Sequence, residues 1–290
     1  MKEFNIKFKN FRVCAGIVTF NSDVKRLRQN IVAIHKQVEA IIIVDNGSKN
    51  IYEIQQLIRE KDNIFLVKNI LNEGIAKALN QIFIFAESRD FNWIITLDQD
   101  SVCENNMIEA FAKYISYPNI GVICPRIDYF NNKQKKDIKS NEIDYVQACM
   151  TSGSLTSLLA WKKVSGFDEW MFIDYVDNDF GMRLKLHGYK IIRVNETILH
   201  HMLGRSEIKR IGIFKALVFN HTPFRNYYYV RNSIYFIKKY RKHINVLKYI
   251  AILIIWELKK LVLEKNRMQT AKSLIVGLKD GITAKYELAK

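Results

Sequence analysis

Proline and glycine are scarce in this chain, whose 290 residues include only three prolines and twelve glycines. We therefore expect no long flexible linker. Long apolar stretches are also missing, since the longest run, residues 249–256, is far shorter than the roughly 20 residues that cross a bilayer. Glycine-rich phosphate loops of the types GxGxxG and GxxxxGKS/T are absent. Their absence disfavours a dinucleotide-binding Rossmann site and a P-loop.

Cysteine is equally sparse. The four cysteines, Cys14, Cys103, Cys124 and Cys149, form no CxxC pair and stand at no metal-binding spacing from a histidine. Three of them lie beside apolar runs, which favours small buried residues and a reduced, cytosolic compartment. Residues 1–12 lack an apolar core, so we expect no secretory signal there.

Acidic residues are few in the last third of the chain. Residues 205–290 contain 19 basic and 5 acidic residues, whereas residues 1–204 contain 26 and 24. Most of the formal net charge of +16 therefore lies in the C-terminal region. Such a balance predicts an anionic partner: nucleic acid, anionic lipid or a phosphorylated substrate.

The composition is that of a folded globular protein, with 49% hydrophobic and 26% charged residues. In the first half, short β-rich runs alternate with helical patterns. The expected strands are residues 13–20, 40–44, 64–67, 93–97 and 121–124, and the expected helices are 24–37, 51–60, 75–88 and 107–115. This alternation predicts an α/β fold with a mostly parallel sheet and helices on both faces. We expect a loop or edge hairpin over residues 128–144 and mainly helix from 206 onward.

Polar residues follow three of the expected strands, on the edge of a parallel sheet where ligands bind. They are Thr19, Phe20 and Asn21 after the first, residues 45–48 after the second, and residues 98–101 after the fourth. For Asp45 alone, ordinary turn chemistry explains the residue equally well. Three such clusters on one edge favour a binding site.

Two carboxylates one residue apart, Asp98 and Asp100, directly follow an apolar strand. They can converge on one divalent cation, and oxygen ligands of this kind suit Mg²⁺ or Mn²⁺, which also hold phosphate oxygens. A DxD pattern alone is usually a solvated turn. Its place after a buried strand makes it informative.

Five acidic side chains fall within twelve residues: Asp168, Glu169, Asp174, Asp177 and Asp179. On a helix beginning near Asp174, Asp179 lies one turn before a basic side chain at position 183 and could pair with it. A capped, charged surface helix is the alternative explanation. Aromatic residues interrupt the acids, which favours a functional cluster.

Two adjacent histidines, His200 and His201, follow an apolar strand at residues 190–194. Adjacent side chains of a strand point to opposite faces, so at most one imidazole can serve a given site. Histidine is a good ligand for divalent metals. A structural histidine is the default for the other.

In this order, these motifs resemble glycosyltransferases of family 2, which have the GT-A fold. The matching motifs are residues 19–21, 44–48, 72–80, 97–101, 151–154 and 174–183. Three further stretches are similar to the rhamnosyltransferase branch of that family: residues 172–177, 201–204 and 225–232. The resemblance covers roughly residues 13–240.

The resemblance implies an inverting transfer from a nucleotide-activated sugar. By matching position, the base and ribose of the donor would contact four residues of the first two loops: Thr19, Phe20, Asn21 and Asp45. Gly74 and Gln99 belong to the same expected donor site. Asp98 would face the ribose or the metal. The metal site, for Mg²⁺ or Mn²⁺, would comprise Asp98, Asp100 and His201.

The resemblance also implies a general base, for which Asp177 occupies the matching position. The family usually has a glutamate just before it, whereas this chain has Val176, so Asp174 and Asp179 stay open as alternatives. The base would take the proton of an acceptor hydroxyl while its oxygen attacks the anomeric carbon. On the acceptor side we expect three residues: Ser152, Gly153 and Trp170. A core position would explain the tryptophan equally well.

Apolar side chains recur at helical spacing in the basic third of the chain. They are Phe214, Leu217, Val218, Tyr235, Phe236, Ile237, Leu247, Ile250, Leu253, Ile254 and Leu258. Basic residues flank each run, a pattern typical of helices that lie in a membrane interface on anionic lipid. No nucleic-acid recognition motif occurs, so we expect no nucleic-acid partner. A partly buried interface of a homo-oligomer is the alternative.

Together these features predict a GT-A catalytic domain over residues 1–205 and a basic amphipathic helical region over 206–290. We expect a metal-dependent, inverting glycosyltransferase that is peripheral on the cytoplasmic face of the cell membrane. The resemblance implies dTDP-rhamnose as donor and a saccharide or lipid-linked saccharide as acceptor, in cell-surface polysaccharide synthesis. One alternative is a UDP-sugar donor that provides galactofuranose or another hexose. Another is a non-catalytic module that binds nucleotide sugar or membrane.

Overall fold

The computed structural model describes residues 11–129, 141–202, 207–211, 214–264 and 267–285. Within them the chain forms two compact units. The first comprises the chain up to Trp170 together with Asp177–Met202, and the second comprises Met171–Val176 together with the chain from Leu203 onward. The expectation of no secretory signal at residues 1–12 falls mostly outside the described residues. So does the middle of the predicted loop or hairpin at 128–144, whose described end contains a strand.

A nine-stranded mixed sheet forms the centre of the first unit, with the order β3-β2-β1-β4-β8-β6-β9-β5 and with β7 beside β9. Its strands are β1 (Val13–Thr19), β2 (Ala40–Asp45), β3 (Ile64–Lys68), β4 (Trp93–Asp98), β5 (Val102–Cys103), β6 (Ile120–Tyr129), β7 (Ile143–Val146), β8 (Ser154–Ser157) and β9 (Lys190–His201). The first four strands, β6 and β9 run in one direction, while β5, β7 and β8 run in the other. The predicted α/β fold with a mostly parallel sheet is therefore confirmed.

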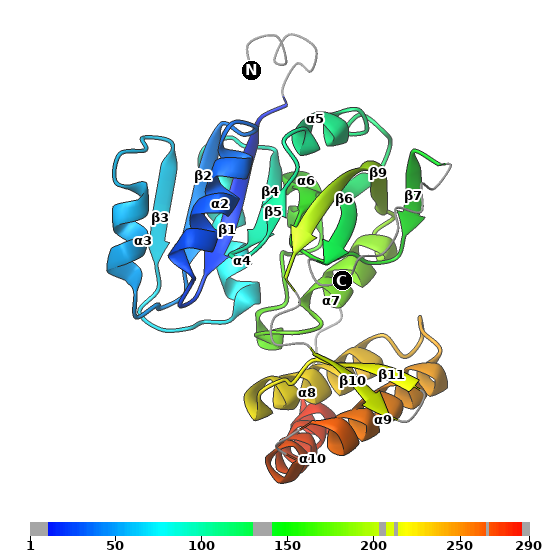
Figure 1. Cartoon of the computed structure of the whole chain (residues 1–290). Coiled ribbons are helices and arrows are strands. Elements are labelled where there is room, and N and C mark those ends of the chain that lie inside the picture. Colours follow the sequence, from blue (N-terminus) through cyan, green and yellow to red (C-terminus); the bar gives the residue numbers. More distant parts are fainter. Residues whose placement is uncertain (1–10, 130–140, 203–206, 212–213, 265–266, 286–290) are drawn as a thin grey trace. The chain divides into compact units, whose positions relative to one another are not determined.

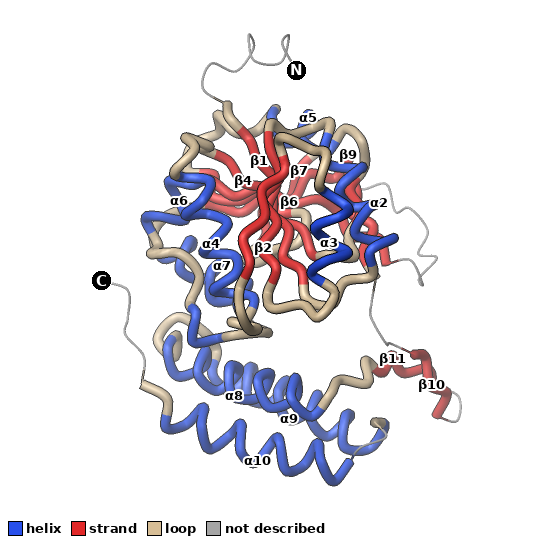
Figure 2. The backbone as a smooth tube through the Cα atoms, turned by 90° about the vertical axis from the view of Figure 1, so that its left-hand side faces the viewer, coloured by secondary structure: helices blue, strands red, loops and turns tan. Residues whose placement is uncertain are grey.

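Helices cover both faces of this sheet. They are α2 (Val24–His35), α3 (Ile51–Ile58), α4 (Ile75–Glu87), α5 (Met107–Ala112), α6 (Leu158–Lys163) and α7 (Val176–Leu186), with a 3₁₀ turn, η1, at Glu169–Met171. Figure 2 shows α2 and α3 on one side of the sheet and α4 and α6 on the other. Every residue of β1 and β2 is buried, as near-continuous apolar runs predict for strands covered on both faces.

A bulge in β9 redirects the end of this strand. Its first half pairs in parallel with β6, but the register shifts after Pro125, so that Arg126 lies opposite Ile198 and residues 195–197 have no partner on β6. A bulge of this kind bends the strand that carries it. Beyond the bulge, the two residues of β5 pair with Leu199 and His200. The end of β9 is thereby joined to the chain that leaves β4.

The second unit consists of three helices and a hairpin. Helices α8 (Pro223–Lys239), α9 (Val246–Leu263) and α10 (Arg267–Thr283) pack alongside one another (Figures 1 and 2). The hairpin pairs β10 (Glu207–Ile211) with β11 (Phe214–Val218). The expectation of helix from residue 206, with Phe214, Leu217 and Val218 at helical spacing, is therefore wrong for residues 207–211 and 214–218. Five-residue segments are too short for a helical period to be told from an alternating one.

The start of α7 also differs from the sequence prediction. The helix begins at Val176 and not near Asp174, because Asp174 and Tyr175 both adopt left-handed backbone conformations, with φ of 63° and 65°. A residue in that conformation cannot continue a right-handed helix. Asp177 is thus in the first turn of α7, whereas Asp174 precedes the helix.

Gly16 of β1 is required by close packing against α4. A Cβ atom at this position would lie 2.3 Å from Cγ2 of Ile82, a branched side chain with little rotational freedom. We predict that Gly16→Ala lowers the free energy of unfolding by about 1–3 kcal/mol, the usual cost of overpacking a core. Urea denaturation measures the change. The same substitution in an Ile82→Ala background should cost much less, and an equal cost there would contradict the steric explanation.

Candidate active site

The ends of β1 and β2 are held together by a buried carboxylate. Thr19 and Asp45 face each other in register, and the Thr19 hydroxyl donates to Oδ1 of Asp45 over 2.9 Å. The other oxygen of Asp45 accepts from the backbone N–H of Ser48 over 2.8 Å. Both side chains are buried, and a buried carboxylate needs such donors. Two of the predicted donor-site residues therefore meet.

The loops after β1, β2 and β4 are tied into one surface. Oε1 of Gln99 accepts from the backbone N–H of Phe20 over 2.8 Å and from the Ser22 hydroxyl over 2.7 Å. Asn21, in a left-handed conformation, donates its backbone N–H to Ser48 and accepts from the backbone N–H of Lys49. The ring of Phe20 is 43% exposed, so a flat ligand could stack on it.

Gly74 lies close to this surface through the side chain of Asn46. The Asn46 amide donates to the carbonyl of Gly74 and to Oδ1 of Asn72, at 3.1 and 2.9 Å, and Asn72 accepts from the Gly74 N–H. Gly74 precedes the first residue of α4 and has φ of +87°, which favours glycine. The predicted donor-site residues from four loops are thus connected by hydrogen bonds.

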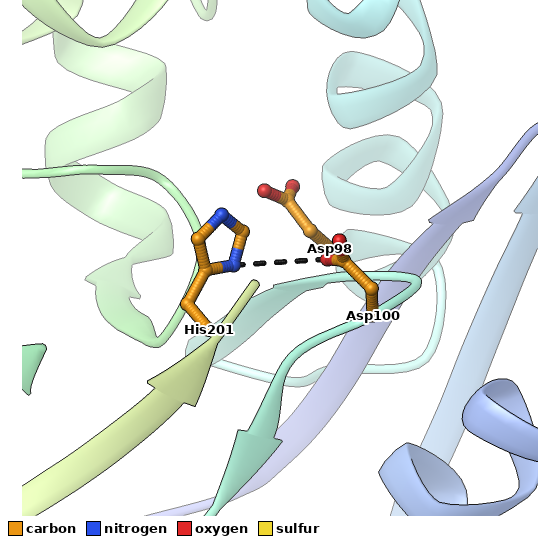
Figure 3. A group of neighbouring side chains, drawn as sticks. All are labelled: Asp98, Asp100 and His201. Carbon is orange, nitrogen blue, oxygen red and sulfur yellow. Dashed lines mark ion pairs between the residues drawn. The ribbon is translucent and has the colours of Figure 1, made fainter. Parts of the chain in front are cut away.

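Asp98, Asp100 and His201 come together at the end of β4, as Figure 3 shows. One ligand atom from each lies within 4.8 Å of those of the others, and Nδ1 of His201 is 3.7 Å from Oδ1 of Asp100. The pairing of β5 with the end of β9 brings them together across 100 residues of sequence. His200 points away and pairs with Asp128 instead, as the alternation of a strand predicts.

These three side chains fit a hard divalent cation. Two carboxylates and one imidazole provide oxygen and nitrogen ligands, a donor set that suits Mn²⁺ and Mg²⁺. All three are partly exposed, which leaves space for ligands from a bound diphosphate. The predicted metal ligands are therefore assembled in the folded chain.

Ser101, to which the sequence assigned no role of its own, contacts His201 and is linked through Ser152 to Asp98, two of the predicted metal ligands. It is fully buried, and its hydroxyl lies 2.8 Å from both Nδ1 of His201 and the hydroxyl of Ser152. Ser152 in turn accepts from the backbone N–H of Asp98 over 2.9 Å. With Nδ1 engaged in this way, Nε2 is the nitrogen available to a cation. A serine directly after the DxD pattern was the only signal in the sequence.

The predicted acceptor-side residues occupy different environments. The Ser152 side chain is buried in the contacts to Ser101 and Asp98. Gly153 has φ of +80°, and a Cβ there would lie 2.9 Å from Leu199. Trp170 is half-buried in the turn η1, so it is not a fully buried core residue.

Asp177 and Asp179 are differently placed on α7. Asp179 is completely buried and pairs with Nε of Arg183 over 2.7 Å, which confirms the predicted pair. Asp177 is half-buried in the first turn, and its Oδ1 accepts from the backbone N–H of Asn178 over 2.9 Å. Since Asp179 is enclosed with its arginine, Asp177 is the better placed of the two to meet an acceptor.

The model of the family described as "Glycosyl transferase family 2" matches residues 14–179, which is more than half of the chain. The chain belongs to glycosyl transferase family 2. The matched region contains both carboxylates of the DxD pattern and ends at Asp179. The protein is thus a glycosyltransferase, and the alternative of a non-catalytic module is set aside.

Comparisons with individual proteins agree with this family. The chain is 25% identical to dTDP-rhamnosyl transferase RfbF of Shigella flexneri over 291 residues, covering 94% of this chain and 96% of that protein. Two solved structures share its GT-A fold. One is GalNAc-T7 with UDP, GalNAc and Mn²⁺ (TM-score 0.61, 13% identity, 79% of this chain and 48% of that one). The other is S. aureus TarS 1-349 with UDP-GlcNAc (TM-score 0.60, 17% identity, 93% and 80%).

We predict that Ser101→Ala weakens Mn²⁺ binding about 10- to 100-fold, the usual effect of removing a group that orients a metal-bound histidine. Asp100→Asn should weaken it further, because it removes a ligand. Mn²⁺ titration of the protein with a nucleoside diphosphate, followed by electron paramagnetic resonance, measures this directly. Ser88→Ala, at the end of α4, is the matched control. Unchanged Mn²⁺ affinity in Ser101→Ala would exclude the orienting role.

Proposed function

We propose that the protein transfers rhamnose from dTDP-rhamnose, with inversion, to a saccharide or lipid-linked saccharide in cell-surface polysaccharide synthesis. The observation that carries the proposal is the similarity to dTDP-rhamnosyl transferase RfbF, which extends over 94% of the chain and includes the C-terminal unit. A match confined to the sheet would support only a nucleotide-sugar transferase in general.

In this proposal the donor lies on the surface formed by the loops after β1, β2 and β4. The exposed ring of Phe20 stacks on the base, and the residues around Asp45 contact the base and ribose. Asp98, Asp100 and His201 hold Mg²⁺ or Mn²⁺, which when bound neutralises charge on the diphosphate. The backbone of Gly153 faces the acceptor.

Asp177 is proposed as the general base. It accepts the proton of the acceptor hydroxyl while the hydroxyl oxygen forms a bond to the anomeric carbon. The bond from that carbon to the diphosphate breaks, and the leaving dTDP takes the electron pair. Attack from the opposite face inverts the anomeric configuration. The half-buried position of Asp177 in the first turn of α7 supports this assignment.

A UDP-sugar donor is the second candidate. It is supported by the shared fold with TarS, which was solved with UDP-GlcNAc. That similarity is 17% in sequence, so it carries less weight for the choice of donor than the full-length match to RfbF. The two candidates differ in base and sugar and can be separated by turnover.

We predict turnover with dTDP-rhamnose that exceeds turnover with UDP-GlcNAc, UDP-galactose and UDP-galactofuranose, together with loss of transfer when the divalent cation is chelated. Asp177→Asn should lower kcat about 10²- to 10⁴-fold, the usual contribution of a general base. Nuclear magnetic resonance of the product reports the anomeric configuration. Asp62→Asn, an exposed aspartate before β3, is the control. Preferred turnover of a UDP-sugar would favour the second candidate, and full activity in excess chelator would exclude the metal.

We further propose that the second unit associates with the anionic inner surface of the cell membrane. Among the described residues, no helix has both the length and the apolar character needed to cross a membrane. The outward side of α9 is nevertheless apolar. Its exposed side chains recur three, four and seven residues apart: Leu247, Ile250, Ile254, Ile255, Leu258 and Val262.

The inward side of α9 is partly polar, which is unusual for an amphipathic helix in water, because its buried residues are Leu253 and Lys260. Lys260 and Glu264 are buried, and Nζ of Lys260 lies 2.8 Å from Glu257 and 4.1 Å from the ring centre of Tyr229. Burial raises the pKa of Glu257 and Tyr229. A helix that turns its apolar side outward is suited to a lipid surface or a partner protein.

Helix α10 also has an apolar side that is exposed. Gly277 and Gly281 face α8 so closely that a Cβ would lie 2.6 and 2.7 Å from carbonyl oxygens of that helix. Met268, Ile275, Leu278 and Ile282 are exposed. Exposed lysines lie beside the apolar sides of both helices, at positions 248, 272 and 279. Such lysines favour anionic lipid over a neutral protein surface.

We predict that the protein binds vesicles containing phosphatidylglycerol and that the double substitution Ile254→Asp, Leu258→Asp reduces this binding at least about tenfold, because each aspartate adds charge to the apolar surface. Vesicle co-sedimentation measures the effect. Ile84→Asp, an equally exposed isoleucine on α4, is the matched control. A wild-type protein that ignores all vesicles, with a double variant that changes from dimer to monomer, would instead support a homo-oligomer.

A further inference from the structure

The segment Met171–Val176, which belongs to the second unit, has an unusual backbone. Phe172, Asp174 and Tyr175 all have left-handed conformations, with φ of 54°, 63° and 65°. Side chains with a Cβ atom rarely adopt this conformation, and three such residues out of four are costly unless the surroundings fix them. The contacts that fix this segment come from α8.

Asn232 of α8 is the central contact. Its Nδ2 donates to the backbone carbonyls of Met171, Ile173 and Asp174, at 2.6, 2.8 and 2.9 Å. Its Oδ1 accepts from Nε of Arg231 over 3.0 Å, so both ends of the amide are engaged. The side chain is completely buried. An amide in this position satisfies carbonyls that the left-handed backbone turns away from any helix or sheet.

Arg225, on the same helix, binds the carboxylate of Asp174 in this segment. Its Nε lies 3.2 Å from both carboxylate oxygens of Asp174, and a second nitrogen lies 2.9 Å from Oδ1. This forked geometry fixes the orientation of the carboxylate, which a lysine could not do. Asp174, an open alternative for the general base, is therefore engaged as an anchor.

Aromatic rings complete the contact. Phe172 stacks on Tyr228 at 4.8 Å between ring centres, and Tyr175 packs against Tyr229 and Phe236 at 5.6 and 5.5 Å. The α8 residues in contact with the segment recur at helical spacing, at positions 224, 225, 228, 229, 232 and 236. They therefore form one continuous side of the helix.

We propose that Asn232 and Arg225 are positioning residues for glycosyl transfer. They hold Met171–Val176 in the left-handed conformation that makes α7 begin at Val176, and Asp177 is the next residue of the chain. The backbone that directly precedes Asp177 is thus held by contacts with α8. This inference rests on the proposed role of Asp177 as general base.

A purely structural role for buried amides of α8 makes a different prediction. Asn226 is as completely buried as Asn232 and lies on the same helix, but its Nδ2 contacts Glu264 and Thr270, at 3.4 Å each. Loss of the Asn226 side chain should loosen the packing of the helices but leave the hydrogen bonds of Asn232 to the carbonyls of Met171–Val176 intact. Asn226→Ala is therefore a matched control for Asn232→Ala.

The experiment compares Asn232→Ala, Arg225→Ala and Arg225→Lys with Asn226→Ala in the full-length protein. We expect Asn232→Ala to lower kcat for transfer about 10- to 100-fold, since a misplacement of about 1 Å can cost 10² in rate. The donor KM and the slow hydrolysis of the donor by water should stay near wild type. The Arg225 side chain is 46% exposed, so we expect its variants to fold, and Arg225→Lys should restore only part of the rate lost in Arg225→Ala.

Hydrogen–deuterium exchange provides a readout that does not need activity. Amides of residues 172–178 should exchange faster in Asn232→Ala and Arg225→Ala than in Asn226→Ala. Equal losses of kcat and equal exchange in the Asn232 and Asn226 variants would overturn the proposal, as would a loss confined to the donor KM. If the wild type transfers no sugar while the exchange difference is present, the proposed function fails and the structural clamp stands.

Discussion

The pairing of two residues of β5 with the end of β9 is the constraint on which the site depends. The DxD carboxylates follow β4 in the middle of the sheet, while His201 ends a strand that starts 92 residues later in the chain at Lys190. Beyond the bulge, the end of β9 pairs with β5, which follows β4 in the chain. Without this pairing the carboxylates would be an ordinary turn and the imidazole a side chain at a strand end.

Ser101 links this constraint to the acceptor side. Its hydroxyl is shared between the imidazole of His201 and the hydroxyl of Ser152, which also holds the backbone of Asp98. A shift of the loop around Ser152 would therefore displace Asp98 and His201, two of the three predicted metal ligands. The positions of Asp98 and His201 and the geometry of the loop around Ser152 are coupled through one buried hydrogen-bond network.

Much of the fold could be predicted because its strands are apolar and its helices periodic. Residues 13–19 and 40–44 are mainly apolar runs rich in β-branched residues, and polar turn residues follow them at the edge where ligands bind. Asp98 and Asp100 could be chosen because they directly follow a buried strand, and His201 because its position matches the metal site of the family that the chain resembles. The pairing of β10 with β11 could not be predicted, because five-residue strands are too short to show a clear alternation of apolar and polar residues.

Long-range polar contacts could not be predicted from the sequence for a different reason. Neither Ser101 nor Asn232 belongs to a sequence pattern that predicts its partners. The two partners of Ser101 lie 51 and 100 residues away, and the three carbonyls that Asn232 contacts lie about 60 residues away. The left-handed residues before α7 were equally hidden. Glycine or asparagine would have signalled them, but Phe172, Asp174 and Tyr175 do not.

The position of Asn232 in the chain has a consequence for synthesis. A ribosome completes the sheet and the metal ligands at His201, but Arg225 and Asn232 emerge later. Until they do, the contacts of α8 that hold the left-handed residues before Asp177 are missing. A nascent chain can therefore form the loop surface after β1, β2 and β4 before the segment next to Asp177 is held. The order of the elements along the gene thus places the completion of this segment after that of the sheet.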